Sequence, residues 1–112
     1  MAKSIIQTEK ECFICRHMLG DGIDLPPRSL EEHHIFNAAN RKLSEQYGLK
    51  VWLCINHHRE GMNAVHRHPY PMILLKRIGQ QAFEEKYGHE EFMKIFGRNY
   101  LEEYNESDQD NT

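Results

Sequence analysis

The stretch that decides the fold is Val51-Trp-Leu-Cys-Ile-Asn-His-His58. Its β-branched and aromatic beginning, residues 51–54, predicts a short strand, and a short helix is expected over about residues 56–61. Where the two elements join, Cys54 and His57 stand three positions apart. A thiolate and an imidazole at this spacing are ligands that zinc prefers, so the stretch predicts half of a metal site.

The other half of this site is expected near the N-terminus, where the sequence has Cys12-x-x-Cys15. Tetrahedral zinc takes four such ligands, so the two pairs predict one closed structural site made by Cys12, Cys15, Cys54 and His57. A single C-x-x-C pair is also typical of a redox dithiol, and His58 is an alternative to His57 as the fourth ligand. Because all three cysteines fall into the two pairs, zinc is favoured over redox chemistry.

The composition places the protein among compact domains of a reducing compartment. Of its 112 residues, 39% are hydrophobic and 28% charged, which is typical of a soluble globular domain. No apolar run approaches the length that spans a bilayer, so no membrane association is expected. The odd cysteine count, and the lack of an apolar core in residues 1–10, predict a cytoplasmic protein without a disulfide framework.

The rest of the chain predicts a small α+β domain around residues 51–58. Residues 12–15 are expected to form a tight turn between extended segments, residues 33–36 a strand, and residues 41–47 a helical turn. Beyond Pro71, apolar residues three and four positions apart predict two packing helices. Glycines would end these helices, at Gly88 and near Gly97.

These elements predict a single domain over residues 1–104. It comprises a zinc knuckle and core over about residues 9–68 and a helical packing segment over about residues 71–104. Residues 105–112 contain no apolar side chain and several acidic ones, so they are predicted to be a disordered tail.

Charge is distributed unevenly along the chain. Residues 33–77 carry seven basic and two acidic side chains and six of the eight histidines, whereas residues 78–112 carry three basic and nine acidic ones. A positive, histidine-rich middle suits a polyanion such as DNA, although solvated lysines and arginines on a small fold give the same pattern. The acidic helices are expected to cover the core and keep DNA off their side. The sequence leaves open whether they also form a homodimer interface.

Once His57 is assigned to zinc, five histidines remain in the basic middle: His33, His34, His58, His66 and His68. One tetrahedral site cannot use all of them. Adjacent residues of a strand point to opposite faces, so His33 and His34 are not ordinary ligands of one ion. The pair suits two tasks near one site, with one imidazole on a metal and the other facing a water molecule.

Residues 32–36, Glu-His-His-Ile-Phe, followed by residues 51–58, resemble the HNH (His-Asn-His, ββα-metal) endonuclease family. The similarity is greatest to small phage-encoded members that carry zinc-binding cysteine pairs, and it covers roughly residues 9–68. It implies a ββα-metal core with a zinc knuckle, followed in this chain by two C-terminal helices. It also implies a phage or prophage protein that acts in the cytoplasm of a bacterial host.

The resemblance implies a role for each matching residue. The ligands of a catalytic ion would be His33, His58 and, as a third, His66. His34 would be the general base, and the four zinc ligands match the structural zinc of the family. The middle asparagine of the family usually stands just before the second strand, where this chain has residues 48–50, Gly-Leu-Lys. Asn40, in the connecting loop, is the nearest candidate for its role.

These residue types fit phosphodiester hydrolysis. An imidazole can deprotonate water near neutral pH, and a cation can stabilise charge on the leaving oxygen. The expected function is therefore a metal-dependent DNA endonuclease or nickase, with a structural Zn²⁺ and a catalytic Mg²⁺, Mn²⁺, Ni²⁺ or Zn²⁺. Flanking phosphates would be held by Arg41, Lys42, Arg59 and Arg67. The alternative is a non-catalytic zinc-finger module that binds nucleic acid or a partner protein.

Overall fold

The computed structural model describes residues 3–25, 29–62 and 64–101, and the predicted tail of residues 105–112 lies outside these ranges. In chain order the elements are α1 (Phe13–Leu19), β1 (Leu30–His34), the 3₁₀-helix η1 (Ala38–Asn40), α2 (Arg41–Tyr47), β2 (Lys50–Cys54), the π-helix η2 (Asn56–Glu60), α3 (Pro69–Tyr87) and α4 (His89–Phe96). This content confirms the predicted α+β class. Within the described ranges, none of the helices is both long and apolar enough to cross a membrane.

The sheet is an antiparallel pair of β1 and β2, in which His33 lies opposite Val51 and His34 lies opposite Lys50. Directly opposite residues share a face, and neighbours along a strand do not. His33 and His34 therefore leave β1 on opposite faces of the sheet. The predicted strand over residues 33–36 is shifted, because Ile35 and Phe36 leave the ladder and enter the core, where both are buried.

The N-terminal segment covers the other edge of β2. The Ser4 hydroxyl donates to the Lys50 carbonyl oxygen at 2.6 Å, and the Ile5 amide donates to the Gly48 carbonyl oxygen at 3.0 Å. The Trp52 amide donates to the side-chain oxygen of Gln7 at 2.8 Å. A two-stranded sheet has little backbone pairing of its own, and these bonds satisfy polar groups that an open edge would expose.

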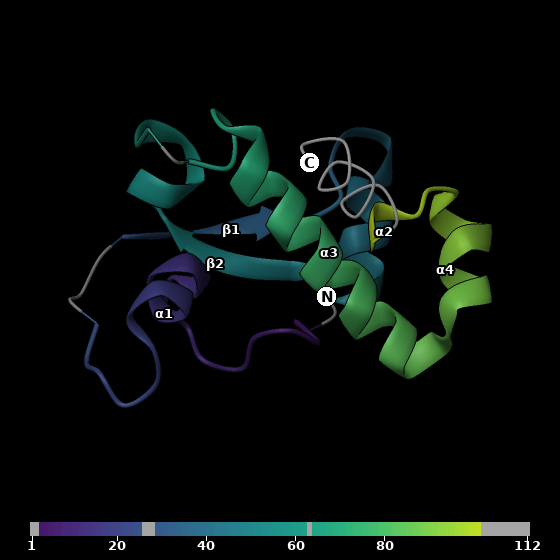
Figure 1. Ribbon diagram of the computed structural model, residues 1–112, viewed down its shortest axis with the longest axis horizontal. Coiled ribbons are helices and arrows are strands. Elements are labelled where there is room, and N and C mark those ends of the chain that lie inside the picture. The colour runs from purple at the N-terminus through teal and green to yellow at the C-terminus, as the bar shows by residue number, and fades with distance from the viewer. Residues whose placement is uncertain (1–2, 26–28, 63, 102–112) are drawn as a thin grey trace, which may run out of the picture.

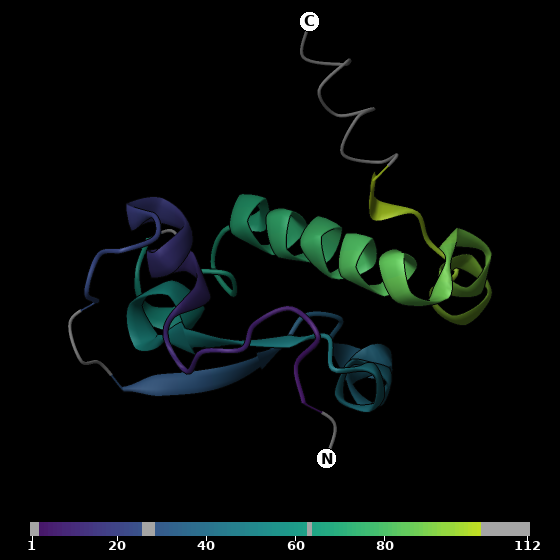
Figure 2. The same cartoon turned by 90° about the horizontal axis from the view of Figure 1, so that it is seen from below.

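The helix α3 crosses one face of the sheet, and α4 turns back beside its C-terminal end (Figures 1 and 2). Gly79 lets α3 approach closely, since a Cβ there would lie 3.2 Å from side-chain atoms of Ile35 and Phe36. The Phe36 ring in turn contacts Phe92 and Phe96 of α4, with ring centroids 5.7 and 4.8 Å apart. The two predicted C-terminal helices thus pack on Ile35 and Phe36 and form the hydrophobic core with them.

The first cysteine pair lies on a helix, and the predicted tight turn over residues 12–15 is wrong. Cys12 is the N-cap of α1, and its sulfur accepts a hydrogen bond from the Cys15 amide at 3.5 Å. Residues three apart on a helix lie on one side of it, so α1 presents both thiols in the same direction. The ion pair between Glu11 and Arg16, 2.7 Å from Oε2 to Nε, ties the residue before the cap to the helix.

Gly48 ends α2 with a φ of +70°, and its Cα faces the N-terminal segment. We expect Gly48→Ala to lower the free energy of unfolding by more than the about 1–2 kcal/mol that a left-handed conformation costs an ordinary residue. The reason is that the added Cβ would overlap the carbonyl oxygen of Lys3. Urea unfolding at equilibrium measures the difference.

Gly97 is the matched control, because its φ is +73° but nothing lies within 4 Å of its added Cβ. We expect Gly97→Ala to show the conformational cost alone. Equal losses in the two variants would mean that the N-terminal segment moves away from the added Cβ of residue 48 at no measurable cost.

Candidate metal centres

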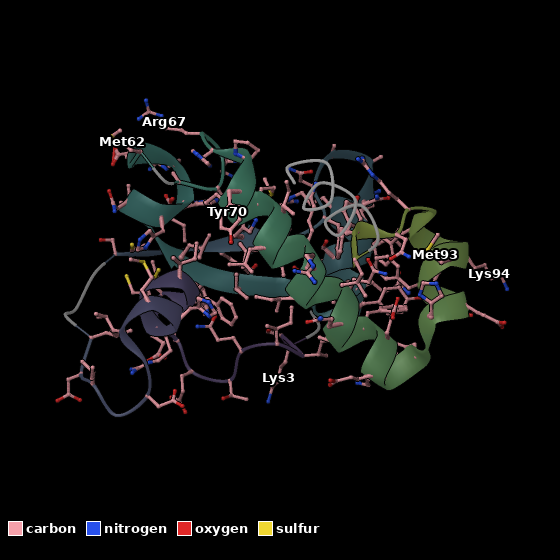
Figure 3. All side chains as sticks on the ribbon, in the orientation of Figure 1. Lys3, Met62, Arg67, Tyr70, Met93 and Lys94 are labelled. Atoms are coloured by element: carbon pink, nitrogen blue, oxygen red, sulfur yellow. The ribbon has the colours of Figure 1, made fainter. Side chains whose placement is uncertain are left out.

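Three sulfurs and one imidazole nitrogen meet between α1 and the end of β2, where Figure 3 shows the sulfur atoms gathered. Nδ1 of His57 lies 3.4 Å from the sulfurs of Cys12, Cys15 and Cys54. The sulfurs of Cys15 and Cys54 are 3.9 Å apart. Ligands of one tetrahedral zinc ion lie about 3.5–3.8 Å from one another, so these four residues could hold one metal ion, and their spacing is compatible with zinc.

The charge of this cluster also favours a cation. Burial, together with the neighbouring thiols of Cys12 and Cys54, raises the pKa of Cys15 to about 12. Three thiolates this close would repel one another. A divalent ion removes that cost and deprotonates the thiols that bind it.

The π-helix η2 separates two adjacent histidines. The ring of His57 lies beside the cysteines, whereas His58 belongs to a second group of residues, so His57 and not His58 completes the cysteine cluster. The chain then turns back on itself, because the amides of Val65 and His66 donate to the carbonyl oxygens of His57 and His58 at 2.8 and 3.2 Å. This return brings His66 beside His58.

The second group consists of His33, His58 and His66, whose ligand atoms all lie within 4.8 Å of one another. The Nε2 atoms of His58 and His66 are 3.1 Å apart. Two nitrogens at about 2.1 Å from one ion lie about 3.0–3.4 Å apart, so the two rings are spaced as neighbouring ligands would be. The structure thus brings together the three histidines predicted to hold a catalytic ion.

His33 is the buried member of this group, with 2% of its surface exposed. Among the described residues, its Nε2 has no hydrogen-bond partner. Burial, with the nearby charges of His58 and His66, lowers the pKa of His33 to about 3, so the ring is neutral near pH 7 and keeps a lone pair. A buried polar atom without a partner is costly, and a metal ion would satisfy it.

Glu31 contacts the ring nitrogen of His58 that does not face His66. Its Oε1 lies 2.8 Å from Nδ1 of His58, and its two oxygens lie 3.0 Å from Nε and Nη2 of Arg59. The hydrogen bonds from Arg59 and His58 lower the pKa of Glu31 to about 2. Sequence reasoning missed Glu31, although its position two residues before His33 on a strand places both on one face.

The predicted general base, His34, lies on the other face of the sheet, and the structure does not bring it into the three-histidine group. Its Nε2 is 2.8 Å from Oε1 of Glu45, and Nζ of Lys50 lies 2.7 Å from Oε2 of the same carboxylate. Hydrogen bonds from Lys50 and His34 lower the pKa of Glu45 to about 2. Glu32, His34 and Glu45 have the spacing of metal ligands, but the Lys50 ammonium already supplies their cation.

Asn40, the candidate for the middle asparagine, precedes α2 as its N-cap residue, and its side chain makes no capping hydrogen bond. The connection between the strands is braced instead by Ser44, which is fully buried. The Ser44 hydroxyl accepts from the Phe36 amide at 2.9 Å and donates to the Phe36 carbonyl oxygen at 2.7 Å. No sequence signal distinguished Ser44 from an exposed helix residue.

The four cations predicted to contact phosphate are exposed, at different places: Arg41, Lys42, Arg59 and Arg67. Arg59 is paired with Glu31. Arg67 donates to the Glu60 carbonyl oxygen at 2.9 Å and stands on the turn before α3, at the outer rim of the molecule (Figure 3). Lys76 of α3, which sequence reasoning missed, lies close enough for its charge to act on His33.

A scan against models of protein families, and searches among curated proteins and solved structures, found no match to this chain.

Proposed function

We propose that this protein is a metal-dependent DNA endonuclease or nickase of the HNH type, with a ββα-metal core and a structural zinc ion. The observation that carries the proposal is the second histidine group beside a complete cysteine cluster. A structural zinc site accounts for His57 alone. Such a site does not account for the group formed by His33, His58 and His66. Within this group the buried Nε2 of His33 lacks a hydrogen-bond partner among the described residues.

The three imidazoles would hold a divalent cation by their nitrogens. When bound, such an ion supplies Lewis acidity on the scissile phosphate and stabilises charge on the leaving oxygen. Since the group draws its ligands from β1, from η2 and from the turn that follows, three separate segments fix the ligand geometry. Rigid placement of this kind is what an ion needs to act on one phosphate oxygen.

His34 is the proposed general base. It is the last residue of β1, and its ring leaves the strand on the face opposite His33, so the water that it activates has to lie past the end of β1, within reach of both this ring and the ion. Its Nε2 donates to the Glu45 carboxylate, which leaves Nδ1 as the nitrogen that can accept a proton from water. Among the described residues, none hydrogen-bonds to Nδ1 of His34. Glu45 is itself held by Lys50, so the ring orientation is supported by two elements, α2 and β2.

DNA is the proposed substrate because the second histidine group lies within the basic part of the chain. Residues 33–77 carry a net charge of +5, whereas the residues after them carry −6. Arg41, Lys42 and Arg67 are exposed cations that can contact phosphates, and Lys76 adds charge beside His33. Contacts of this kind position a duplex without reading its sequence.

A cleavage assay on supercoiled plasmid, with Mg²⁺ or Mn²⁺, tests the proposal. We expect the wild-type protein to produce nicked circles. The rate of nicking should fall in His58→Ala by more than about 10–100-fold, which is the loss typical when only an outer partner of a metal ligand is removed. The control is His17→Ala, which removes an exposed histidine of α1 that belongs to neither cluster.

The same assay distinguishes the proposed nuclease from the alternative, a zinc-finger module that binds nucleic acid or a partner protein without cutting. Such a module would retain DNA on a filter or gel but leave the plasmid supercoiled with every cation. It would also bind one ion per chain, since only the cysteine cluster would be used.

A further inference from the structure

Glu31 joins the histidine group to Arg59, and it lies outside the set of residues that would touch an ion or a phosphate. It accepts from Nδ1 of His58 at 2.8 Å, and Arg59 grips both of its oxygens in a forked pair. A carboxylate held by an arginine in this way is ionised, and an ionised carboxylate can only accept. Nδ1 of His58 must therefore carry the hydrogen.

This hydrogen bond fixes the tautomer of His58. A neutral imidazole has one N–H and one lone pair, so a proton on Nδ1 leaves the lone pair on Nε2. Nε2 is the atom that lies 3.1 Å from Nε2 of His66, inside the three-histidine group. The Glu31 carboxylate thus aims the correct nitrogen at the point where the ligands converge.

We propose that Glu31 is a positioning residue of the second metal site, which sets the tautomer and ring orientation of His58 and so raises the affinity for the ion. The inference rests on the proposed function only in using the same metal site. Outer carboxylates of this type contribute about 10–100-fold to the metal affinity of the histidines they hold.

In this arrangement Arg59 orients the Glu31 carboxylate, whereas the sequence predicted that it contacts phosphate. It is adjacent to His58 on η2, and its forked pair keeps the Glu31 carboxylate in place across β1 and η2. Arg59 is half exposed, with 52% of its side-chain surface accessible, so water screens part of this ion pair. The loss of Arg59 should therefore weaken the metal site less than the loss of Glu31.

The test is calorimetric titration of Ni²⁺ into protein already loaded with one zinc ion. We expect wild-type protein to bind one Ni²⁺ per chain, Glu31→Ala to raise the Kd by about 10–100-fold, and Arg59→Gln to raise it by less. Glu32→Ala is the matched control, because it removes the same side chain and charge one residue along β1 on the opposite face, where Glu32 pairs with Lys50. Its Kd should stay within about twofold of wild type, because it touches no ligand of the site.

Nitrogen-15 NMR of the histidine rings provides a second readout that needs no bound ion. In the zinc-loaded wild type, His58 should show the Nδ1–H tautomer, and in Glu31→Ala it should show a mixture. A Glu31→Ala protein that binds Ni²⁺ as tightly as wild type would overturn the inference, as would a wild type that binds no Ni²⁺ beyond the zinc.

Failure of this inference is distinguishable from failure of the proposed function. Weakened Ni²⁺ binding in Glu31→Ala, with no plasmid nicking by wild type, would sustain the role of Glu31 and contradict the nuclease. Nicking by wild type, with unchanged Ni²⁺ binding in Glu31→Ala, would sustain the nuclease and contradict the role of Glu31.

Discussion

His34→Ala is expected to lower the rate of plasmid nicking by about 10²–10⁴-fold, the range that a general base contributes. The imidazole offers Nδ1 for the proton of the attacking water, and alanine has no group that can take its place. The measurement is the rate at which supercoiled plasmid becomes nicked in saturating Mg²⁺ or Mn²⁺. Because His34 lies outside the three-histidine group, Ni²⁺ binding should remain within a few-fold of wild type.

Glu45→Gln tests whether His34 acts as a base or only supports the structure. The glutamine keeps the size of the side chain and can still accept from Nε2 of His34, so nicking should fall much less than in His34→Ala. Unchanged nicking in His34→Ala would show that this imidazole is not the base. The proton would then have to be taken by another group that lies closer to the three-histidine group.

Cys12→Ser is expected to abolish the cooperative thermal unfolding transition near neutral pH. In zinc-finger peptides the bound ion supplies an apparent 10–16 kcal/mol or so, which is comparable to the whole stability of a domain, about 5–15 kcal/mol. Serine is close to cysteine in size, so the loss measures the missing ligand rather than a cavity at this buried position. Circular dichroism during heating, with zinc stoichiometry measured beside it, gives the result.

Met18→Ala is the control for this experiment. Met18 belongs to the same helix, α1, but 70% of its surface is exposed and it binds no ligand, so its melting curve should resemble wild type. A Cys12→Ser protein that melts within a few degrees of wild type would show that the apolar core alone holds the fold, and that the cysteine cluster is not structural.

Local spacing determined much of the first metal cluster. Two residues three positions apart lie close together in a helix or a tight turn alike, which is why the Cys12 and Cys15 pair survived the wrong prediction of its backbone. The pair formed by Cys54 and His57 spans the end of β2 and the start of η2, and its spacing was equally informative. Helical periodicity likewise located α3 and α4, because a packed helix must bury one face.

Only the tertiary structure decided between His57 and His58 as the fourth ligand. Adjacent residues of η2 point in different directions, and the direction in which each points depends on how β2 packs against α1. The positions of Glu31 and Glu45 are also tertiary facts. Glu31 meets His58 across 27 positions of sequence and Glu45 meets His34 across 11, and no local pattern records either pairing.

By itself, the sequence therefore determined which side chains can bind metal and which of them lie close together in pairs, because both follow from residue type and short-range spacing. The register of β1 on β2 sends His33 and His34 to opposite faces, and the return of residues 64–66 onto η2 brings His66 to His58. Both depend on hydrogen bonds between distant segments. The division of the histidines between a metal group and a separate pairing with Glu45 could be seen only after the chain had folded.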